Sequence, residues 1–255
     1  MKTRLFDAHN HLQNYSNGAE TEDALERASA AGVAGMLCNG TSPADWERVS
    51  ALAAGHKGII PCFGLHPWFV GKVRPGWLGL LEGFLSRSPS CVGEIGLDKA
   101  ASSDFAEQEE SFRAQLRLAK KLERPVSIHC VRAWGRLLEV LKEERPPAFM
   151  LHAYGGPPEM TGELAGLGAY FSFSGAVLDP EREKMRKALL AAPPERLLFE
   201  TESPGPALPG RRPGPQGVVE VIGAAAAALG QTPEALGTLS WRNAETFLGE
   251  LFSQL

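Results

Sequence analysis

Residues 4–11 read RLFDAHNH, a short apolar run that ends in two histidines one residue apart. Side chains alternate along an extended strand, so we expect Asp7, His9 and His11 to point to the same side. Two imidazoles with this spacing can bind one divalent metal ion, and imidazole is a ligand suited to Zn, Fe, Ni or Cu. The pattern alone is equally compatible with a metal site and with ordinary surface histidines. The rest of the sequence is needed to decide between the two.

Length and composition leave two architectures open. A chain of 255 residues can form one large α/β barrel or two small domains. Its 44% hydrophobic and 22% charged residues are typical of a soluble globular protein, and no apolar run approaches the roughly 20 residues that cross a bilayer. The histidine stretch begins too early to leave room for a cleaved secretory signal. We expect a cytoplasmic, monomeric protein without a membrane partner.

The charge pattern limits the kinds of nucleic-acid contact. A net charge of −4, from 26 basic and 30 acidic residues, argues against a broad, salt-sensitive grip on duplex nucleic acid. The basic pairs at 120–121 and 211–212 are expected on the surface. The cysteines form no Cys-x-x-Cys pair and lie in apolar runs, so we expect them reduced and buried: Cys38, Cys62, Cys91 and Cys130.

Short apolar runs alternate with longer amphipathic segments along the whole chain. The expected strands are Arg4–Asp7, Gly35–Asn39, Ile59–Gly64, Cys91–Glu94, Val126–Cys130, Phe149–His152, Tyr170–Ser174 and Leu197–Glu200. The expected helices include Glu20–Ala31, Pro43–Ala54, Asp104–Leu122, Ala133–Glu144, Pro180–Ala191 and Gly223–Leu229.

This alternation implies parallel strands joined by right-handed crossovers. Eight such units in about 250 residues have the size of a closed (β/α)8 barrel. An open doubly wound sheet is the alternative, but no Gly-x-Gly-x-x-Gly turn follows the first strand. We therefore expect a single-domain (β/α)8 TIM barrel over residues 1–255. The Pro- and Gly-rich stretch 203–216 is expected to be a loop beside the site.

Polar residues cluster where the expected strands end, which is where such barrels keep their chemistry. Five of the six histidines lie at these edges, and only His56 does not. Chance would scatter them, so shared metal ligation is the better explanation of the set. The residues at these edges are His9, His11, His66, Glu94, Asp98, His129, His152, Glu200 and Glu202.

Four histidines and a pair of carboxylates are enough for two cations. Glu94 could bridge them, its two oxygens spanning metals roughly 3.5–4 Å apart. A bridging water would then deprotonate near neutral pH and attack a phosphoryl or carbonyl centre. Asp98 either orients a histidine from behind or caps a helix.

Six motifs together resemble the TatD family of metal-dependent hydrolases, in the right order over residues 4–204: DAHNHL at 7–12, GLHP at 64–67, GEIGLD at 93–98, IHC at 128–130, HAYGG at 152–156 and ETESP at 200–204. The resemblance implies a (β/α)8 barrel of the metal-dependent hydrolase type that acts as a deoxyribonuclease.

The resemblance also assigns site residues. It implies that His9, His11 and Glu94 hold one metal ion, while Glu94, His129 and His152 hold the other. His66 would approach the substrate phosphate. Arg132 stands where many members have another residue, and is either a phosphate contact or a surface residue. The two ions are divalent, with Zn, Mn, Mg, Fe and Ni all compatible with these ligands.

Glu202 departs from the family, which normally has Asp at this position. The extra methylene moves the carboxylate by roughly 1.3–1.5 Å, and misplacement on that scale can cost about 100-fold in rate. Glu202 keeps the charge, so it is assigned as a metal ligand and, together with Glu94, as a catalytic residue, Glu202 being the general base.

Three functions follow for this chain. The first is a metal-dependent phosphodiesterase acting at nucleic-acid ends or on a small phosphodiester, with metal-bound hydroxide as nucleophile. The second uses the same metals on a carboxylic ester or amide, because the fold does not separate these reactions. The third is a metal-binding scaffold without catalysis, motivated by Glu202.

Overall fold

The computed structural model describes residues 3–179, 181–205 and 212–255. Eight strands form one sheet in the order β1 to β8, and every neighbouring pair is parallel. The strands are β1 Leu5–Asn10, β2 Val33–Asn39, β3 Ile59–Phe63, β4 Cys91–Asp98, β5 Val126–Val131, β6 Phe149–Leu151, β7 Ala169–Phe173 and β8 Leu197–Phe199.

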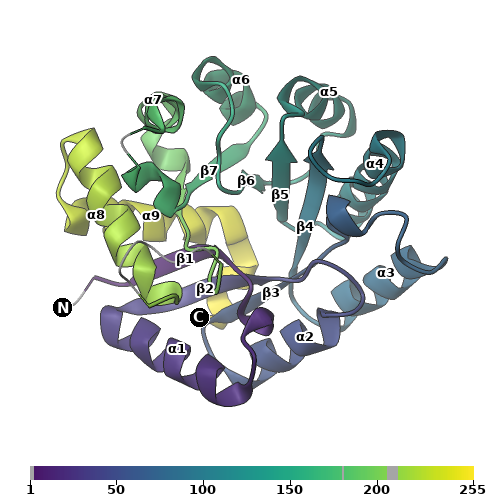
Figure 1. The fold of residues 1–255 in the computed structure, drawn as a ribbon, viewed down its shortest axis with the longest axis horizontal. Helices are drawn as coiled ribbons and strands as arrows, with labels where there is room; N and C mark the ends of the chain where they lie inside the picture. The colour runs from purple at the N-terminus through teal and green to yellow at the C-terminus, as the bar shows by residue number, and fades with distance from the viewer. Residues whose placement is uncertain (1–2, 180, 206–211) are drawn as a thin grey trace.

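Helices surround the strands on the outside, as Figure 1 shows. They are α1 Gly18–Ala31, α2 Trp46–Gly55, α3 Trp77–Arg87, α4 Phe105–Lys121, α5 Trp134–Glu144, α6 Thr161–Gly166, α7 Glu183–Ala191, α8 Val218–Leu229 and α9 Pro233–Leu248. None of the helices in the described residues is long and apolar enough to span a membrane.

Backbone hydrogen bonds close the barrel between its first and last strands. The amide of Glu202 donates to the carbonyl of His9 at 3.0 Å, and the amide of His11 donates to the carbonyl of Ser203 at 2.7 Å. These bonds join the end of β1 to the segment that follows β8. The expected (β/α)8 barrel is therefore confirmed, and the open doubly wound sheet is excluded.

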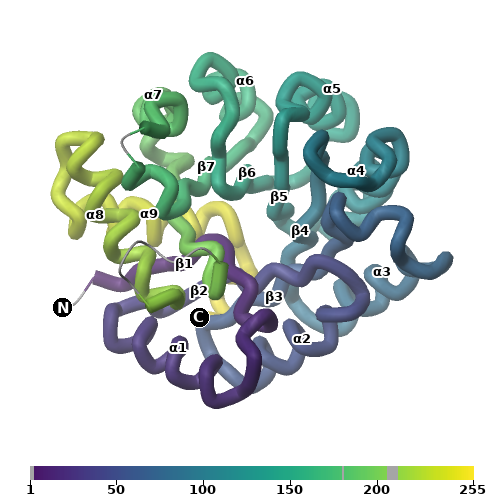
Figure 2. Tube along the Cα trace, viewed as in Figure 1, coloured from purple at the N-terminus to yellow at the C-terminus, as the bar shows by residue number. Residues whose placement is uncertain are grey.

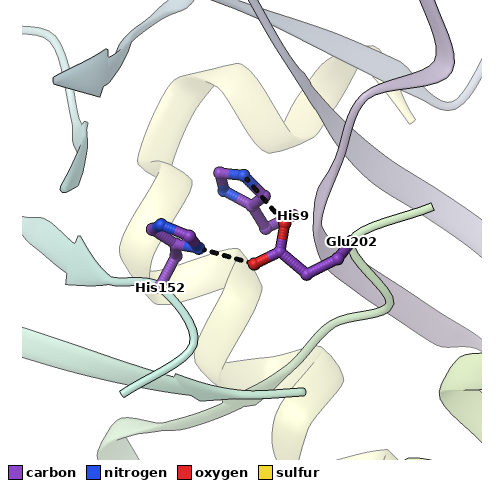
Figure 3. A group of neighbouring side chains, drawn as sticks. All are labelled: His9, His152 and Glu202. Carbon is purple, nitrogen blue, oxygen red and sulfur yellow. Dashed lines mark ion pairs between the residues drawn. The ribbon is translucent and has the colours of Figure 1, made fainter. Parts of the chain in front are cut away.

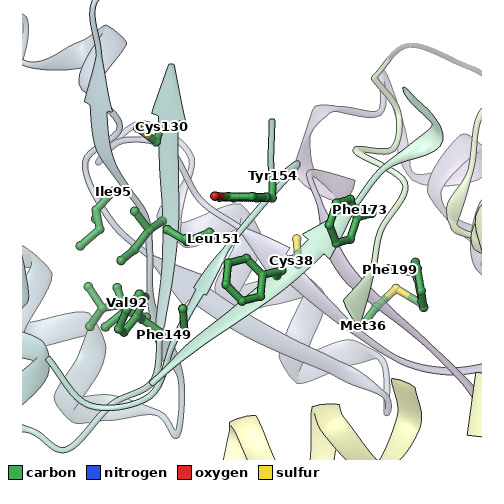
Figure 4. Close-up of a cluster of buried hydrophobic side chains, with 14 of the residues drawn as sticks. Met36, Cys38, Val92, Ile95, Cys130, Phe149, Leu151, Tyr154, Phe173 and Phe199 are labelled. Atoms are coloured by element: carbon green, nitrogen blue, oxygen red, sulfur yellow. The ribbon is translucent and has the colours of Figure 1, made fainter. Parts of the chain in front are cut away.

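Two apolar layers hold the barrel together. The larger one lies between strands and outer helices and includes Phe149, Leu151 and Tyr154 (Figure 4). A second cluster contains Phe6, and there α9 packs its Phe247 against the strands. In the tube view of Figure 2, α9 lies behind the strands. The four cysteines are buried and free, as expected.

Several expected boundaries were wrong, and each has a local cause. The helix expected at Pro43 begins at Trp46, because the Asp45 carboxylate accepts the amide hydrogens of Thr41 and Ser42 and holds that segment as a turn. Asp104 does cap α4, accepting from the amides of Ala106 and Glu107.

The expected start of α7 also shifts. Part of that expectation, Pro180, lies outside the described residues, and the helix begins at Glu183. The turn before it is closed by the Arg182 amide, which donates to the Asp179 carbonyl at 3.1 Å.

β4 is longer than expected and runs through its glycines. The sequence predicted a strand that ends at Glu94, but β4 continues to Asp98 and pairs with β5. Gly96 pairs with His129, and its φ of 149° lies in the region that favours glycine. A Cβ at Gly96 would lie 1.9 Å from the His129 carbonyl oxygen. The glycine allows the two strands to approach closely beside the site.

Gly96→Ala should therefore destabilise the protein. The added methyl group overlaps the His129 backbone, which we expect to lower the free energy of unfolding by roughly 1–3 kcal/mol or more. Gly83→Ala is the matched control, because nothing lies within 4 Å of a Cβ at that exposed position of α3. It should raise stability by about 0.5–1 kcal/mol. Urea denaturation of both variants checks this, and an undiminished midpoint for Gly96→Ala would contradict it.

Candidate active site

A cavity of about 530 Å³ opens at the carboxyl ends of the strands. The side chains that line it come from segments far apart in the sequence and include most of those expected from the strand ends. They are His11, Asn14, Thr41, His66, Trp68, Phe69, Glu94, His129, His152, Glu202, Pro204 and Gly205. Pro204 and Gly205 place the start of the 203–216 loop beside the site, as expected; residues 206–211 of that loop lie outside the described residues.

Glu94 lies at the centre of this group and is only 3% exposed. Its Oε2 is 3.4 Å from the Nε2 atoms of both His9 and His11. Its Oε1 is 2.9 Å from His129 Nδ1 and 2.9 Å from His152 Nε2. One carboxylate therefore turns each of its oxygens towards a different pair of imidazoles.

The electrostatics of Glu94 follow from its neighbours. Burial alone would raise the pKa of its carboxyl group, but His152, His66 and His9 outweigh burial and hold that pKa well below its usual range. Glu94 is therefore an anion near neutral pH.

His11 presents a free nitrogen to the cavity. Its Nδ1 donates to the carbonyl of Asn39 at 2.7 Å, since a carbonyl can only accept. In the neutral ring Nε2 then carries a lone pair. Burial lowers the pKa of His11, which favours this neutral form. The Nε2 atoms of His9 and His11 are 3.2 Å apart. Two nitrogens at about 2.0–2.1 Å from a tetrahedral Zn²⁺ would lie about 3.3 Å apart.

His129 is oriented by a carboxylate behind it. Its Nε2 lies 3.3 Å from Asp98 Oδ2, which leaves Nδ1 facing Glu94 and His152. The end of β4 is itself fixed by Gln108 of α4, which accepts the Asp98 amide hydrogen at 2.8 Å. Of the two roles considered for Asp98, the structure places it in the first, against the outer nitrogen of a histidine. Such carboxylate partners raise the basicity of a metal-binding imidazole.

Glu202 reaches the same cavity from the segment after β8. Its Oε1 is 3.0 Å from His152 Nδ1, and its Oε2 is 3.8 Å from His9 Nε2 (Figure 3). The same Oε2 is also 3.8 Å from His11 Nε2. Its backbone has a φ of 61°, an uncommon left-handed conformation for a glutamate. Burial would raise the pKa of Glu202, but His152 and His9 outweigh it and hold the pKa below its usual range.

His66 has the opposite proton arrangement to His11. Its Nδ1 accepts the amide hydrogen of Trp68 at 3.1 Å, so the neutral ring carries its proton on Nε2. That Nε2 lies 3.2 Å from Glu94 Oε1. Burial lowers the pKa of His66 more than Glu94 raises it. His66 is therefore a neutral N–H donor inside the cavity, which suits contact with an anionic oxygen better than metal ligation.

Two expected placements are not found. Asp7 does not line the cavity: its carboxylate accepts from Asn10 and twice from Thr201. The strand pairing of β1 shifts register between Asp7 and Asn10, which breaks the alternation assumed from the sequence. Arg132 is exposed, has a φ of 54°, and is not among the cavity-lining residues. Its role as a phosphate contact stays a prediction.

Two further residues have positions that spacing alone did not reveal. Glu200 is fully buried, and its Oε1 accepts from the Ala153 amide at 3.0 Å and lies 3.5 Å from His152 Nδ1. Ser127 Oγ lies 3.3 Å from His9 Nδ1. Each contacts the outer nitrogen of a histidine whose inner nitrogen faces Glu94. The sequence places Glu200 at the same edge of the barrel as His152, but it reveals neither this contact nor the position of Ser127.

The donor set fits divalent cations. Three groups of histidines and carboxylates each bring their donor atoms within 4.8 Å of one another: His9, His152 and Glu202; His9, His11 and Glu94; and His66, Glu94 and His129. Mixed imidazole and carboxylate ligands suit first-row metals. Such a set, at the carboxyl ends of a (β/α)8 barrel, defines a metal-dependent hydrolase.

Comparison with known proteins gives the family. The model of the family TatD related DNase matches residues 6–249, and the chain belongs to this family. It is 31% identical to the 3'-5' ssDNA/RNA exonuclease TatD of Citrobacter koseri over 97% of this chain and 100% of that protein. It is 31% identical over 80% of its length to the metal-dependent hydrolase YjjV of Escherichia coli, and covers 81% of it.

A solved structure agrees along nearly the whole chain. The crystal structure of YjjV, a TatD homologue from Escherichia coli, superposes with a TM-score of 0.90 at 27% identity, covering 96% of this chain and 98% of that one. The barrel and its metal-dependent hydrolase class are thus shared by sequence and by fold.

The interaction between Asp98 and His129 generates a prediction. Asp98→Asn keeps the shape of the side chain but removes the charge that holds the proton on His129 Nε2. We expect Mn²⁺ or Zn²⁺ affinity to fall about 10–100-fold, measured by titration calorimetry. Asp104→Asn is the control, since Asp104 only caps α4 and Asn is an equally good cap. Equal metal affinity in Asp98→Asn and the natural chain would contradict this role.

Proposed function

We propose that this protein is a two-metal phosphodiesterase that removes nucleotides from the 3' end of single-stranded DNA or RNA. The support is threefold: membership of the TatD related DNase family, relatives named 3'-5' ssDNA/RNA exonuclease TatD, and the site itself. The observation that carries the proposal is the position of the Glu94 carboxylate. One of its oxygens faces His9 and His11, and the other faces His129 and His152.

The proposed metal ligands follow from this arrangement of the two Glu94 oxygens. His9, His11 and Glu94 would hold one divalent ion, and Glu94, His129 and His152 the other. Glu202 would complete the ligand set, because its carboxylate reaches both His152 and the pair of His9 and His11. When bound, the two cations would activate water and stabilise the charge that develops on a phosphoryl group. Zn²⁺, Mn²⁺, Fe²⁺ and Ni²⁺ are compatible with these donors, whereas Mg²⁺, which prefers oxygen ligands, fits so many imidazoles less well.

The protein's own groups would position the phosphate and move a proton. His66 would donate its Nε2 hydrogen to a non-bridging phosphate oxygen, since its tautomer is fixed by the Trp68 amide. Glu202 would accept the proton of the attacking water at its carboxylate, which faces the cavity. Asp98 would keep the His129 ring in place. A cavity of about 530 Å³ has the size of a small-ligand pocket, which favours a single terminal nucleotide as the occupant.

A strand-end assay tests the proposal. With Mn²⁺, we expect the protein to shorten a 5'-labelled single strand stepwise from its 3' end, and EDTA to abolish the reaction. A duplex with blunt ends and an acyl ester serve as alternative substrates. Hydrolysis of the acyl ester alone would show that the metal site acts on carbon rather than on phosphorus, and would overturn the nuclease assignment.

Substitution of Glu202 gives a second prediction. Glu202→Gln removes the proton acceptor and should lower kcat on the oligonucleotide about 10²–10⁴-fold. Glu202→Asp keeps the charge but withdraws the carboxylate from His152, so kcat should fall roughly 10–100-fold. Steady-state kinetics at saturating metal measure both. If the natural chain and Glu202→Asp both fail to hydrolyse any ester, the chain is a metal-binding scaffold and not an enzyme.

A further inference from the structure

Trp68 is an aromatic side chain at the mouth of the cavity to which the proposed reaction assigns no step. It lines the cavity, yet its side chain is 55% exposed. A tryptophan in such a position usually has its N–H bonded to water, but here Nε1 donates to Asp98 Oδ2 at 2.7 Å. The indole is therefore anchored by its N–H edge and contacts the His66 ring at a centroid distance of 4.9 Å, while more than half of the side chain is open to solvent.

Phe69 connects the active-site cavity to a second one. It lines both the central cavity and a neighbouring cavity of about 410 Å³. Lys72 and Arg74, both exposed, also line the neighbouring cavity. Within the described part of the chain, neither of them has a carboxylate within ion-pair distance. Lys72 and Arg74 are thus two unpaired positive side chains at the exit from the active site, although the protein has a net charge of −4.

The groove on the other side of the same loop differs in charge from this exit. A cavity of about 400 Å³ there is lined by Glu107 and Glu110. It shares four lining residues with the cavity of Lys72 and Arg74, namely Val73, Pro75, Gly76 and Trp77. Carboxylates repel phosphates, whereas lysine and arginine bind them. A nucleic-acid backbone that leaves the active site would therefore follow the side of Lys72 and Arg74.

We propose that Trp68, Phe69, Lys72 and Arg74 form a strand track for single-stranded nucleic acid. Trp68 stacks on a base that flanks the scissile phosphodiester, and the strand then passes Phe69 so that Lys72 and Arg74 contact the phosphates of more distant nucleotides. Rigid aromatic platforms beside basic grooves are how proteins bind single strands without sequence preference. This inference rests on the proposed nuclease function and adds how the substrate is held.

The stacking part is tested with Trp68→Ala and Trp68→Phe on a short oligothymidylate. Trp68→Ala should raise KM about 5- to 100-fold with little change in kcat. Trp68→Phe keeps a ring but loses the bond to Asp98, and should stay within about 3-fold of the natural KM. On an oligonucleotide whose flanking nucleotides lack bases, Trp68→Ala and the natural chain should have equal KM.

A purely structural role for Trp68 gives different results. If Trp68 acts only by holding Asp98, then Phe and Ala will lower kcat alike, and the loss will persist on the abasic substrate. Either result overturns the stacking assignment.

The basic part is tested through salt dependence. Lys72→Gln with Arg74→Gln should weaken binding of a long single strand and lower the slope of log K against log salt by about 1.4, because each phosphate that is no longer neutralised accounts for about 0.7. A dinucleotide is too short to reach them, so its KM should not change. Lys184→Gln with Arg186→Gln, on α7 across the barrel from α3 (Figure 1), makes the same charge change and is the control.

The outcomes separate the track from the function on which it rests. If the natural chain shortens single strands but the Lys72 and Arg74 pair behaves like the α7 control, the track is wrong and the nuclease function stands. If the natural chain hydrolyses no phosphodiester under any metal, both are overturned.

Discussion

The site depends on one buried carboxylate, that of Glu94, whose two oxygens face different histidines. Glu94 is buried, ionised and surrounded by imidazoles, and one of its oxygens faces His9 and His11 while the other faces His129 and His152. A buried anion is costly unless it is paired. In this protein the compensation comes from the imidazoles of His152, His66 and His9, and imidazole and carboxylate groups are also the kinds of group that bind divalent cations.

The barrel is the scaffold that makes this convergence possible. His9, Glu94 and His129 come from three strands that are separated in sequence by helices, and parallel pairing brings their carboxyl ends to one rim. Contacts outside the cavity hold two of the histidines in place: the Asn39 carbonyl accepts from His11, and Asp98 lies against His129. The pairing of Gly96 with His129 also fixes the position of the His129 backbone relative to β4. Preorganisation of this kind lowers the cost of assembling a metal site.

The sequence predicted the barrel well because its signal is repetitive. Alternating apolar runs and amphipathic segments give the order of elements, and five histidines at strand ends locate the site. What escaped prediction has a tertiary origin. Asp7 faces Thr201 instead of the cavity, and the register of β1 shifts just after it; the continuation of β4 through Gly96 depends on how closely β5 approaches. The left-handed backbone at Glu202, which aims its longer side chain at His152, has no sequence signature for a glutamate.

The most direct measurement of the central claim is anomalous scattering from crystals grown with Mn²⁺ or Zn²⁺, combined with metal analysis of the same protein. The account predicts two ions per chain roughly 3.5–4 Å apart, one beside each oxygen of Glu94. A single ion, or ions bound away from Glu94, would contradict the proposal that this carboxylate bridges a pair of cations.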